Sequence, residues 1–366
     1  MLHILTIIGA RPQFIKAAAI SRAIRQFDNI QETIVHTGQH FDANMSDIFF
    51  DEMGIPKPNY HLHVNSLSHG AMTGRMLEEI EKVLLQEKPD VVLVFGDTNS
   101  TLAGALAAKK HHIKIAHVEA GLRSFNMRMP EEVNRILTDR ISDFLYCPTD
   151  TAVINLEAEG FRQYPCSIEQ VGDVMLDAAM YYLPISSQKS SILRDMDLNQ
   201  DQFLLVTIHR AENTDHPQRL AEIVEAINKL SKDFDVVFPV HPRTKHLLSN
   251  LSISPRVKLV DPVGYFDMIQ LINGCRLVVT DSGGLQKEAY FFKRFCVTVR
   301  DQTEWVELVE HGYNRLSSTK SSDIQDAVHF FLKQTFKTGE ALYGNGDASN
   351  RICRSLLNHH DKNHSI

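Results

Sequence analysis

The stretch LVVTDSGGLQKEAYFF, residues 277–292, decides the fold of this chain. Its first apolar residues predict a buried strand, and its last ones predict the body of a helix. A strand that turns through Ser282-Gly283-Gly284 into a helix forms an anion site, because glycines allow close backbone approach and the first helical N–H groups point at the ligand. Glu288, one turn further on, is placed to bind ribose hydroxyls. A nucleoside diphosphate fits this site, and an ordinary N-cap at Ser282 is the alternative.

Composition sets the limits within which the rest of the chain is interpreted. The chain has 366 residues, enough for two domains, and a net charge of -7, which predicts no nucleic-acid partner. It has no apolar run of membrane-spanning length, and Arg11 and Lys16 closely follow the apolar start, which argues against a signal peptide. The five cysteines are scattered without a CxxC pair, which favours free thiols in the cytoplasm. The histidine pairs lack metal-site spacing, so no metal is expected.

Short apolar runs alternate with amphipathic segments along the whole chain. This order predicts an α/β protein with parallel sheets covered on both faces. Strands are expected at 2–8, 33–36, 91–95, 113–118 and 144–147, with helices at 14–25, 72–85, 98–109 and 131–141. The pattern restarts with strands at 203–207, 236–239, 257–260, 277–280 and 296–299, separated by helices at 219–230, 266–272 and 285–292.

We therefore expect two doubly wound, Rossmann-like domains whose strand ends face each other across a cleft. An N-terminal domain over 1–172 would carry acid–base carboxylates, and a C-terminal domain over 173–345 would bind the nucleotide. A C-terminal helix over 346–366 could pack back on the N-terminal domain.

Charged side chains gather where the predicted strands end. Taken singly, each has an ordinary explanation: Asp97 as a turn or N-cap residue, Glu131 as a first-turn carboxylate, and Arg123 as a surface ion pair. Taken together they favour a ligand, because cations and carboxylates that converge on one place are costly to bury without one. The cations suit a diphosphate, and the carboxylates suit acid–base chemistry.

Six segments, in order along almost the whole chain, resemble the UDP-N-acetylglucosamine 2-epimerases. No single segment is specific, but together they are highly so. They are residues 9–16 (GARPQFIK), 96–98 (GDT), 117–123 (HVEAGLR), 130–135 (PEEVNR), 209–213 (HRAEN) and 281–288 (DSGGLQKE).

The resemblance implies the two-domain fold of B-type glycosyltransferases, with UDP held mainly by the second domain and the sugar between the domains. By the same resemblance, Asp97, Glu119 and Glu131 are the acid–base carboxylates, and His209 joins the catalytic set while also neutralising the diphosphate. Resemblance and strand-end position together assign substrate binding to Arg11, Lys16, Arg135, Arg210, His241, Ser282, Gly283, Gly284, Glu288 and Arg300. A cytoplasmic homodimer that serves polysaccharide synthesis, as for O-antigen or capsule, is also implied.

Within the family, the chain is most similar to the branch acting on UDP-2,3-diacetamido-2,3-dideoxy-glucuronate. Residues 6–16, 123–130 and 300–307 carry this similarity. Enzymes for plain UDP-N-acetylglucosamine usually have Glu where this chain has Gln13, and Arg-Pro where it has Trp305-Val306. Arg128 or Arg123 could bind the uronate carboxylate. The segment after Gln39 departs from the pattern that binds a second, activating substrate molecule, so allosteric activation is not expected.

The chemistry of C2 shapes the expected mechanism. A C2 hydrogen with no adjacent carbonyl is barely acidic, so elimination of UDP from C1, giving a glycal, must accompany proton removal. UDP then re-adds while a proton reaches the other face of C2. The steps need bound UDP and proton-transfer groups, but no metal or redox cofactor. The rival functions are a UDP-sugar glycosyltransferase of the same fold, an epimerase that hydrolyses its substrate, and a nucleotide-binding module without activity.

Overall fold

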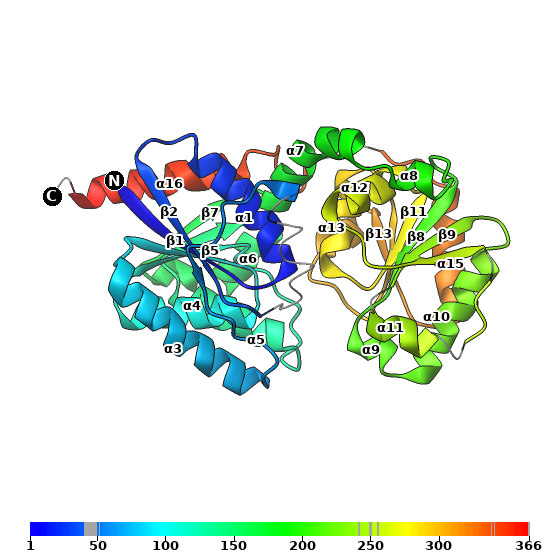
Figure 1. Ribbon diagram of the computed structural model, residues 1–366, viewed down its shortest axis with the longest axis horizontal. Helices are drawn as coiled ribbons and strands as arrows, with labels where there is room; N and C mark the ends of the chain where they lie inside the picture. Colours follow the sequence, from blue (N-terminus) through cyan, green and yellow to red (C-terminus); the bar gives the residue numbers. More distant parts are fainter. Residues whose placement is uncertain are drawn as a thin grey trace. The chain divides into compact units, whose positions relative to one another are not determined.

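The structure, a computed structural model, describes residues 1–39, 50, 52–240, 242–248, 251–254, 256–337, 339 and 341–364. The chain divides into two compact units, each built on its own sheet (Figure 1). The first unit holds Met1–Met180 and Ala341–Ile366, and the second holds Tyr181–Glu340.

The first unit is built on a sheet of seven parallel strands in the order β3-β2-β1-β4-β5-β6-β7. The strands are β1 (Leu2–Ile8), β2 (Ile30–His36), β3 (Tyr60–His61), β4 (Val91–Phe95), β5 (Lys114–Val118), β6 (Phe144–Cys147) and β7 (Ser167–Gln170). The helices are α1 (Arg11–Ile24), α3 (His69–Glu87), α4 (Asn99–Lys110), α5 (Pro130–Ile141), α6 (Asp150–Ala158), η1 (Phe161–Gln163), α7 (Val174–Lys189) and α16 (Ala348–His364). Helix α7 continues across the boundary into the second unit.

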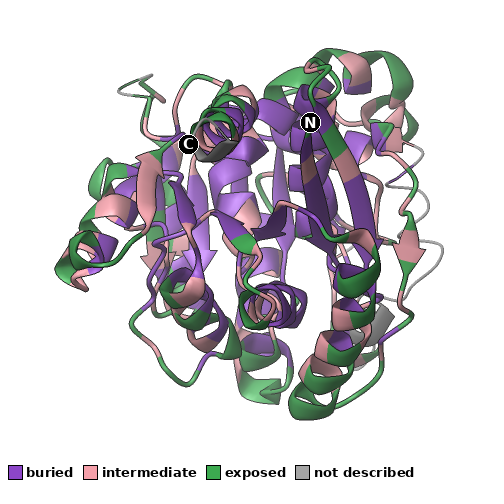
Figure 2. Cartoon of the chain, turned by 90° about the vertical axis from the view of Figure 1, so that its left-hand side faces the viewer, coloured by how far each residue is buried: buried purple, intermediate pink, exposed green. Residues whose placement is uncertain are grey.

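Burial in the first unit follows from the continuous apolar strands. All residues of β4 and β6 are buried, as expected for parallel strands covered on both faces. Figure 2 shows the central strands mostly buried and the outward faces of the helices exposed. The C-terminal helix α16 packs against α1, and the Asp177 carboxylate accepts hydrogen bonds from its first N–H groups, at 3.2 Å from Ala348 and 2.7 Å from Ser349.

The second unit repeats the architecture with six parallel strands in the order β10-β9-β8-β11-β12-β13. The strands are β8 (Phe203–Thr207), β9 (Asp235–Pro239), β10 (Val257–Val260), β11 (Leu277–Thr280), β12 (Cys296–Val299) and β13 (Asn314–Ser317). The helices are α8 (Ile192–Asp195), α9 (Ala211–Thr214), α10 (Pro217–Leu230), α11 (Pro242–Leu248), α12 (Tyr265–Gly274), α13 (Gly283–Phe291), α14 (Val306–Glu310) and α15 (Ser321–Leu332).

Both sheets reverse their strand order at one point, between β1 and β4 in the first unit and between β8 and β11 in the second. Open parallel sheets bind ligands outside the carboxyl ends of the strands at such a switch point. These four strands are followed, within three residues, by Arg11, Asp97, His209 and Ser282. The topology thus marks the same residues as the sequence.

Three edge strands escape the sequence pattern. Strands β3, β7 and β13 are short, and β7 and β13 are mostly polar, with the sequences SIEQ and NRLS. Their pairing with a neighbour, and not an apolar run, makes them strands. Helix α1 begins at Arg11, earlier than expected, because Pro12 suits the first turn.

Candidate functional site

A cation and a carboxylate meet at the centre of the first unit's sheet. Lys16, on α1, forms an ion pair with Glu119, the residue after β5, and both side chains are at least nine-tenths buried. Glu119 has a φ of +73°, a conformation that costs energy outside glycine. Gly96 makes room for the pair, because a Cβ there would lie 3.1 Å from the Glu119 carboxylate and 3.3 Å from the Lys16 Nζ. Sequence placed both residues in the site, and the structure brings them into contact.

A second pair forms at the end of β4. Arg135, on α5, donates from Nε to the Asp97 Oδ2 at 3.2 Å, and its Nη2 contacts the same oxygen. The Asn134 side chain donates to the Asp97 backbone oxygen at 2.9 Å. The Asp97 side chain is 30% exposed, so it is held by a fixed cation while it remains open to a ligand. Glu131, in the first turn of α5, is exposed.

A buried ionic network connects the ends of β4 and β5 to helix α5. His117, on β5, lies 2.7 Å from the Gly96 carbonyl through Nε2 and 2.7 Å from Asp139 through Nδ1. The ring thus bridges the end of β4 and helix α5. Arg123 donates to Asp139 at 2.7 Å and to Glu159 at 2.6 Å. Burial acts to raise the pKa of Asp139, but His117 and Arg123 hold it below its ordinary value.

Arg123, a candidate for the uronate carboxylate, and Gln13, which marks the similarity to the diacetamido-glucuronate branch, both make internal contacts. Arg123 is 3% exposed and fully engaged with Asp139 and Glu159, so it is not available for a substrate carboxylate. Gln13 is 1% exposed, and its side chain accepts from the Gly9 backbone at 2.8 Å and donates to the Phe95 carbonyl at 2.9 Å. It ties the turn after β1 to the end of β4. Arg128, by contrast, is exposed.

In the second unit, Asp281 organises the ends of β8 and β11. Its buried carboxylate accepts from the backbone N–H groups of His209 at 3.1 Å and Arg210 at 3.0 Å, and from the Asn213 side chain at 3.1 Å. The His209 ring lies 3.4 Å from the same carboxylate and is 53% exposed. Asp281 thus fixes the turn that presents His209 and Arg210 beside the start of α13.

The start of α13 has two glycines with different surroundings. Ser282 is the N-cap residue, but its side chain makes no capping hydrogen bond. A Cβ on Gly283 would lie 2.4 Å from the Glu304 carboxylate, whereas one on Gly284 would meet nothing within 4 Å. Arg300 pairs with Glu304 at 3.0 Å. Gly283 therefore accommodates an internal carboxylate, and Gly284 has open space beside it.

Further along α13, Glu288, the residue predicted to bind the ribose, and the adjacent Lys287 are buried inside the second unit. Glu288 is 6% exposed and lies on the buried face of the helix. The Lys287 ammonium lies 3.9 Å above the ring of Trp305, which is 3% exposed. Trp305 therefore packs inside the unit, and any effect on the substrate must pass through its neighbours.

Two further expectations concern residues outside the described part of the chain: His241, and the segment after Gln39. Arg11 is the first residue of α1 and is half-buried. Within the described ranges, no group of three or more His, Cys, Asp or Glu side chains could hold a metal ion. No helix in those ranges is long and apolar enough to cross a membrane.

The sequence analysis gave no role to four residues that each make several buried hydrogen bonds in the structure: Glu132, Asp139, His117 and Asp281. A signal for two of them was present. Glu132, Arg135 and Asp139 follow at intervals of three and four residues, which places all three on one face of a helix. Three charged residues on the face that packs against a sheet indicate a buried ionic network.

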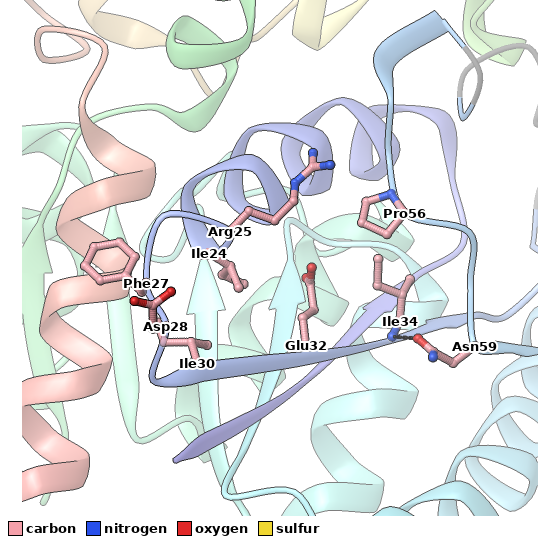
Figure 3. A pocket seen from close by; sticks show the side chains of 9 residues that line it. All are labelled: Ile24, Arg25, Phe27, Asp28, Ile30, Glu32, Ile34, Pro56 and Asn59. Atoms are coloured by element: carbon pink, nitrogen blue, oxygen red, sulfur yellow. Dashed lines mark hydrogen bonds between the residues drawn. The ribbon is translucent and has the colours of Figure 1, made fainter.

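A separate cavity of about 360 Å³ lies beside β2, where Ile30, Glu32 and Ile34 line it (Figure 3). The side chains of Arg25, Asp28, Glu32 and Asn59 line it together with apolar residues. Burial raises the pKa of Glu32 above its ordinary value. The strand-end residues described above do not line this cavity.

Two parallel-sheet α/β units, each with a switch point in its strand order, define the class: proteins with the fold of B-type glycosyltransferases. A profile of the UDP-N-acetylglucosamine 2-epimerases matches residues 22–357, and the chain belongs to that family.

Similarity to individual proteins extends over nearly the full chain. The chain is 55% identical to the UDP-2,3-diacetamido-2,3-dideoxy-D-glucuronate 2-epimerase of Pseudomonas aeruginosa, over 97% of this chain and 99% of that protein. The UDP-GlcNAc 2-epimerase of Methanocaldococcus jannaschii, solved with UDP-GlcNAc and UDP, superposes with a TM-score of 0.89 at 43% identity, over 97% and 99% of the two chains. The Neisseria meningitidis enzyme bound to UDP-GlcNAc has the same TM-score at 29% identity, over 98% and 100%.

Proposed function

We propose that this protein inverts C2 of a UDP-2-acetamido sugar and that its preferred substrate is UDP-2,3-diacetamido-2,3-dideoxy-glucuronate. The observation that carries the reaction class is the pair of cation–carboxylate contacts, Lys16 with Glu119 and Asp97 with Arg135, at neighbouring strand ends of one sheet. The substrate assignment rests on the 55% identity to a protein named for that activity.

In this proposal, one carboxylate of the first unit removes the C2 proton as the C1–O bond breaks and UDP leaves. The electrons of the C2–H bond become the C1–C2 double bond of a glycal. UDP then adds back to C1 while a carboxylic acid returns a proton to the opposite face of C2. Asp97, Glu119 and Glu131 share the proton transfers.

The departing diphosphate is stabilised by cations and by backbone N–H groups. We assign this role to Arg11, Lys16, His209 and the start of α13, with the Ser282 hydroxyl and the open side of Gly284 facing the ligand. Glu288 binds the ribose. Arg135 positions Asp97 and contributes to substrate binding, and Arg210, His241 and Arg300 complete the proposed substrate-binding set.

Arg128 is the proposed partner of the uronate carboxylate. It is exposed in the loop before α5, whereas Arg123 is held inside the unit. An exposed arginine keeps its forked donors free for a carboxylate of the substrate. We further propose a cytoplasmic homodimer that serves polysaccharide synthesis, as for O-antigen or capsule.

Side-by-side kinetics with the two UDP sugars test the substrate. UDP-2,3-diacetamido-2,3-dideoxy-glucuronate should have the higher kcat/KM, and Arg128→Ala should lower that value while leaving UDP-N-acetylglucosamine unaffected. Arg162→Ala, which removes another exposed arginine of the same unit, is the matched control. Equal kcat/KM values for both sugars would refute the substrate assignment and leave the epimerase class intact. Transfer of the sugar to an acceptor would instead identify a glycosyltransferase.

A further inference from the structure

Phe125 stands out in the loop between β5 and α5, because its backbone conformation costs stability and its side chain gains little stability from burial. Its φ is +57°, a left-handed conformation that costs an L-residue with a side chain energy. The residue is also 79% exposed, so its side chain gains almost nothing from burial. Residues held in such conformations cluster at functional sites. The fold alone gives no reason for a phenylalanine at this position.

The surrounding structure holds Phe125 firmly in place. Glu132, which is fully buried, accepts hydrogen bonds from the Phe125 N–H at 2.8 Å and from the Ser124 N–H and hydroxyl, both at 2.9 Å. The same carboxylate accepts from Arg135 at 2.7 Å, and Arg135 in turn binds Asp97. Two side chains therefore connect the strained residue to a proposed acid–base carboxylate.

We propose that Phe125 is a substrate-contacting residue whose ring packs against the apolar C–H face and acetamido methyl groups of the sugar. The inference rests on the proposed function. The Phe125 backbone is tied through Glu132 and Arg135 to a proposed acid–base carboxylate. Its exposed aromatic ring offers a flat apolar surface, which matches the non-polar faces of an acetamido sugar and not its hydroxyls. The UDP portion of the substrate has no part in this contact, so Phe125 acts on the sugar alone.

Three substitutions separate the ring from the backbone conformation. Phe125→Gly and Phe125→Asn remove the ring and suit a positive φ, and Phe125→Tyr keeps the ring. Leu137→Ala, at a 47% exposed position on α5, is the control for loss of an exposed apolar side chain. The measurements are kcat/KM for the UDP sugar, the Kd of UDP by calorimetry, and the midpoint of thermal unfolding.

The Gly and Asn variants should lose about two- to tenfold in kcat/KM, the range expected for one aromatic contact. Their Kd for UDP should be unchanged and their unfolding midpoint no lower than that of the wild type. The Tyr variant and the Leu137 control should match the wild type. Unchanged kcat/KM without the ring, or a Tyr variant as impaired as the Gly variant, would overturn this inference alone. A wild-type protein that turns over no UDP sugar would overturn the proposed function and this inference with it.

Discussion

Arg123→Met should destabilise the first unit strongly. The guanidinium is buried and donates to Asp139 at 2.7 Å, to the Leu122 carbonyl at 2.7 Å and to Glu159 at 2.6 Å. Methionine keeps the bulk of the side chain but leaves Asp139, which is fully buried, without its arginine partner. Removing one partner of a buried ion pair costs about 3–5 kcal/mol. With an m-value of about 2 kcal/mol per M of urea, the unfolding midpoint should fall by roughly 1.5–2.5 M.

Urea titration with two probes provides the assay. Far-UV circular dichroism follows both units, and the fluorescence of Trp305, the chain's one tryptophan, reports on the second. Because Arg123 lies in the first unit, the lower urea midpoint is expected in the circular dichroism and not in the Trp305 fluorescence. Arg162→Met is the control, because Arg162 pairs with Glu157 at the surface with its side chain 74% exposed, and such a pair is worth about 0–1 kcal/mol. Equal shifts in the two variants would refute the reasoning.

The destabilisation caused by Arg123→Met should depend on pH. The folded-state pKa of Asp139 lies below the ordinary value of 3.8, so its stabilising contribution is complete well above pH 3.8. The contribution is lost as the pH falls through the folded-state pKa, because protonation removes the charge that Arg123 compensates. The difference in unfolding free energy between wild type and Arg123→Met should therefore shrink below pH 3.8.

Four further substitutions test the proposed site. Gly283→Ala should cost about 1–3 kcal/mol in unfolding experiments because its Cβ would displace the Glu304 carboxylate, whereas Gly284→Ala should leave stability equal or higher yet weaken UDP binding in calorimetry. Glu288→Ala should raise the Kd of UDP, and an unchanged Kd would exclude its ribose contact. Glu131→Gln should lower kcat by about 10²–10⁴-fold with UDP affinity unchanged, and near-normal turnover would remove Glu131 from the acid–base set.

Much of the fold could be predicted because its signals are local. Buried parallel strands such as Val91–Phe95 are continuous apolar runs, and Ser282-Gly283-Gly284 after a strand marks a strand-to-helix turn. The edge strand Asn314–Ser317 carries no such signal, since it is a strand only by virtue of its neighbour β12. Local patterns predict the core of a sheet better than its edges.

The candidate site shows a different limit. Charged residues at strand ends could be found in the sequence, but their partners could not, because those lie far apart along the chain. Arg123 was a candidate for the uronate carboxylate, yet Asp139 and Glu159 engage it internally. Sequence could not show that Gly283 and Gly284 differ, since a Cβ would meet Glu304 at the first and nothing within 4 Å at the second. Sequence indicates which residues are chemically able to act, and the structure decides which are free to do so.

The central claim is that C2 is inverted with UDP re-added to the sugar, and incubation of the UDP sugar in heavy water with NMR detection tests it most directly. Our account predicts deuterium at C2 of both epimers, with the UDP–sugar bond intact at equilibrium. Epimers that form without deuterium at C2, or stoichiometric release of UDP and free sugar, would contradict it.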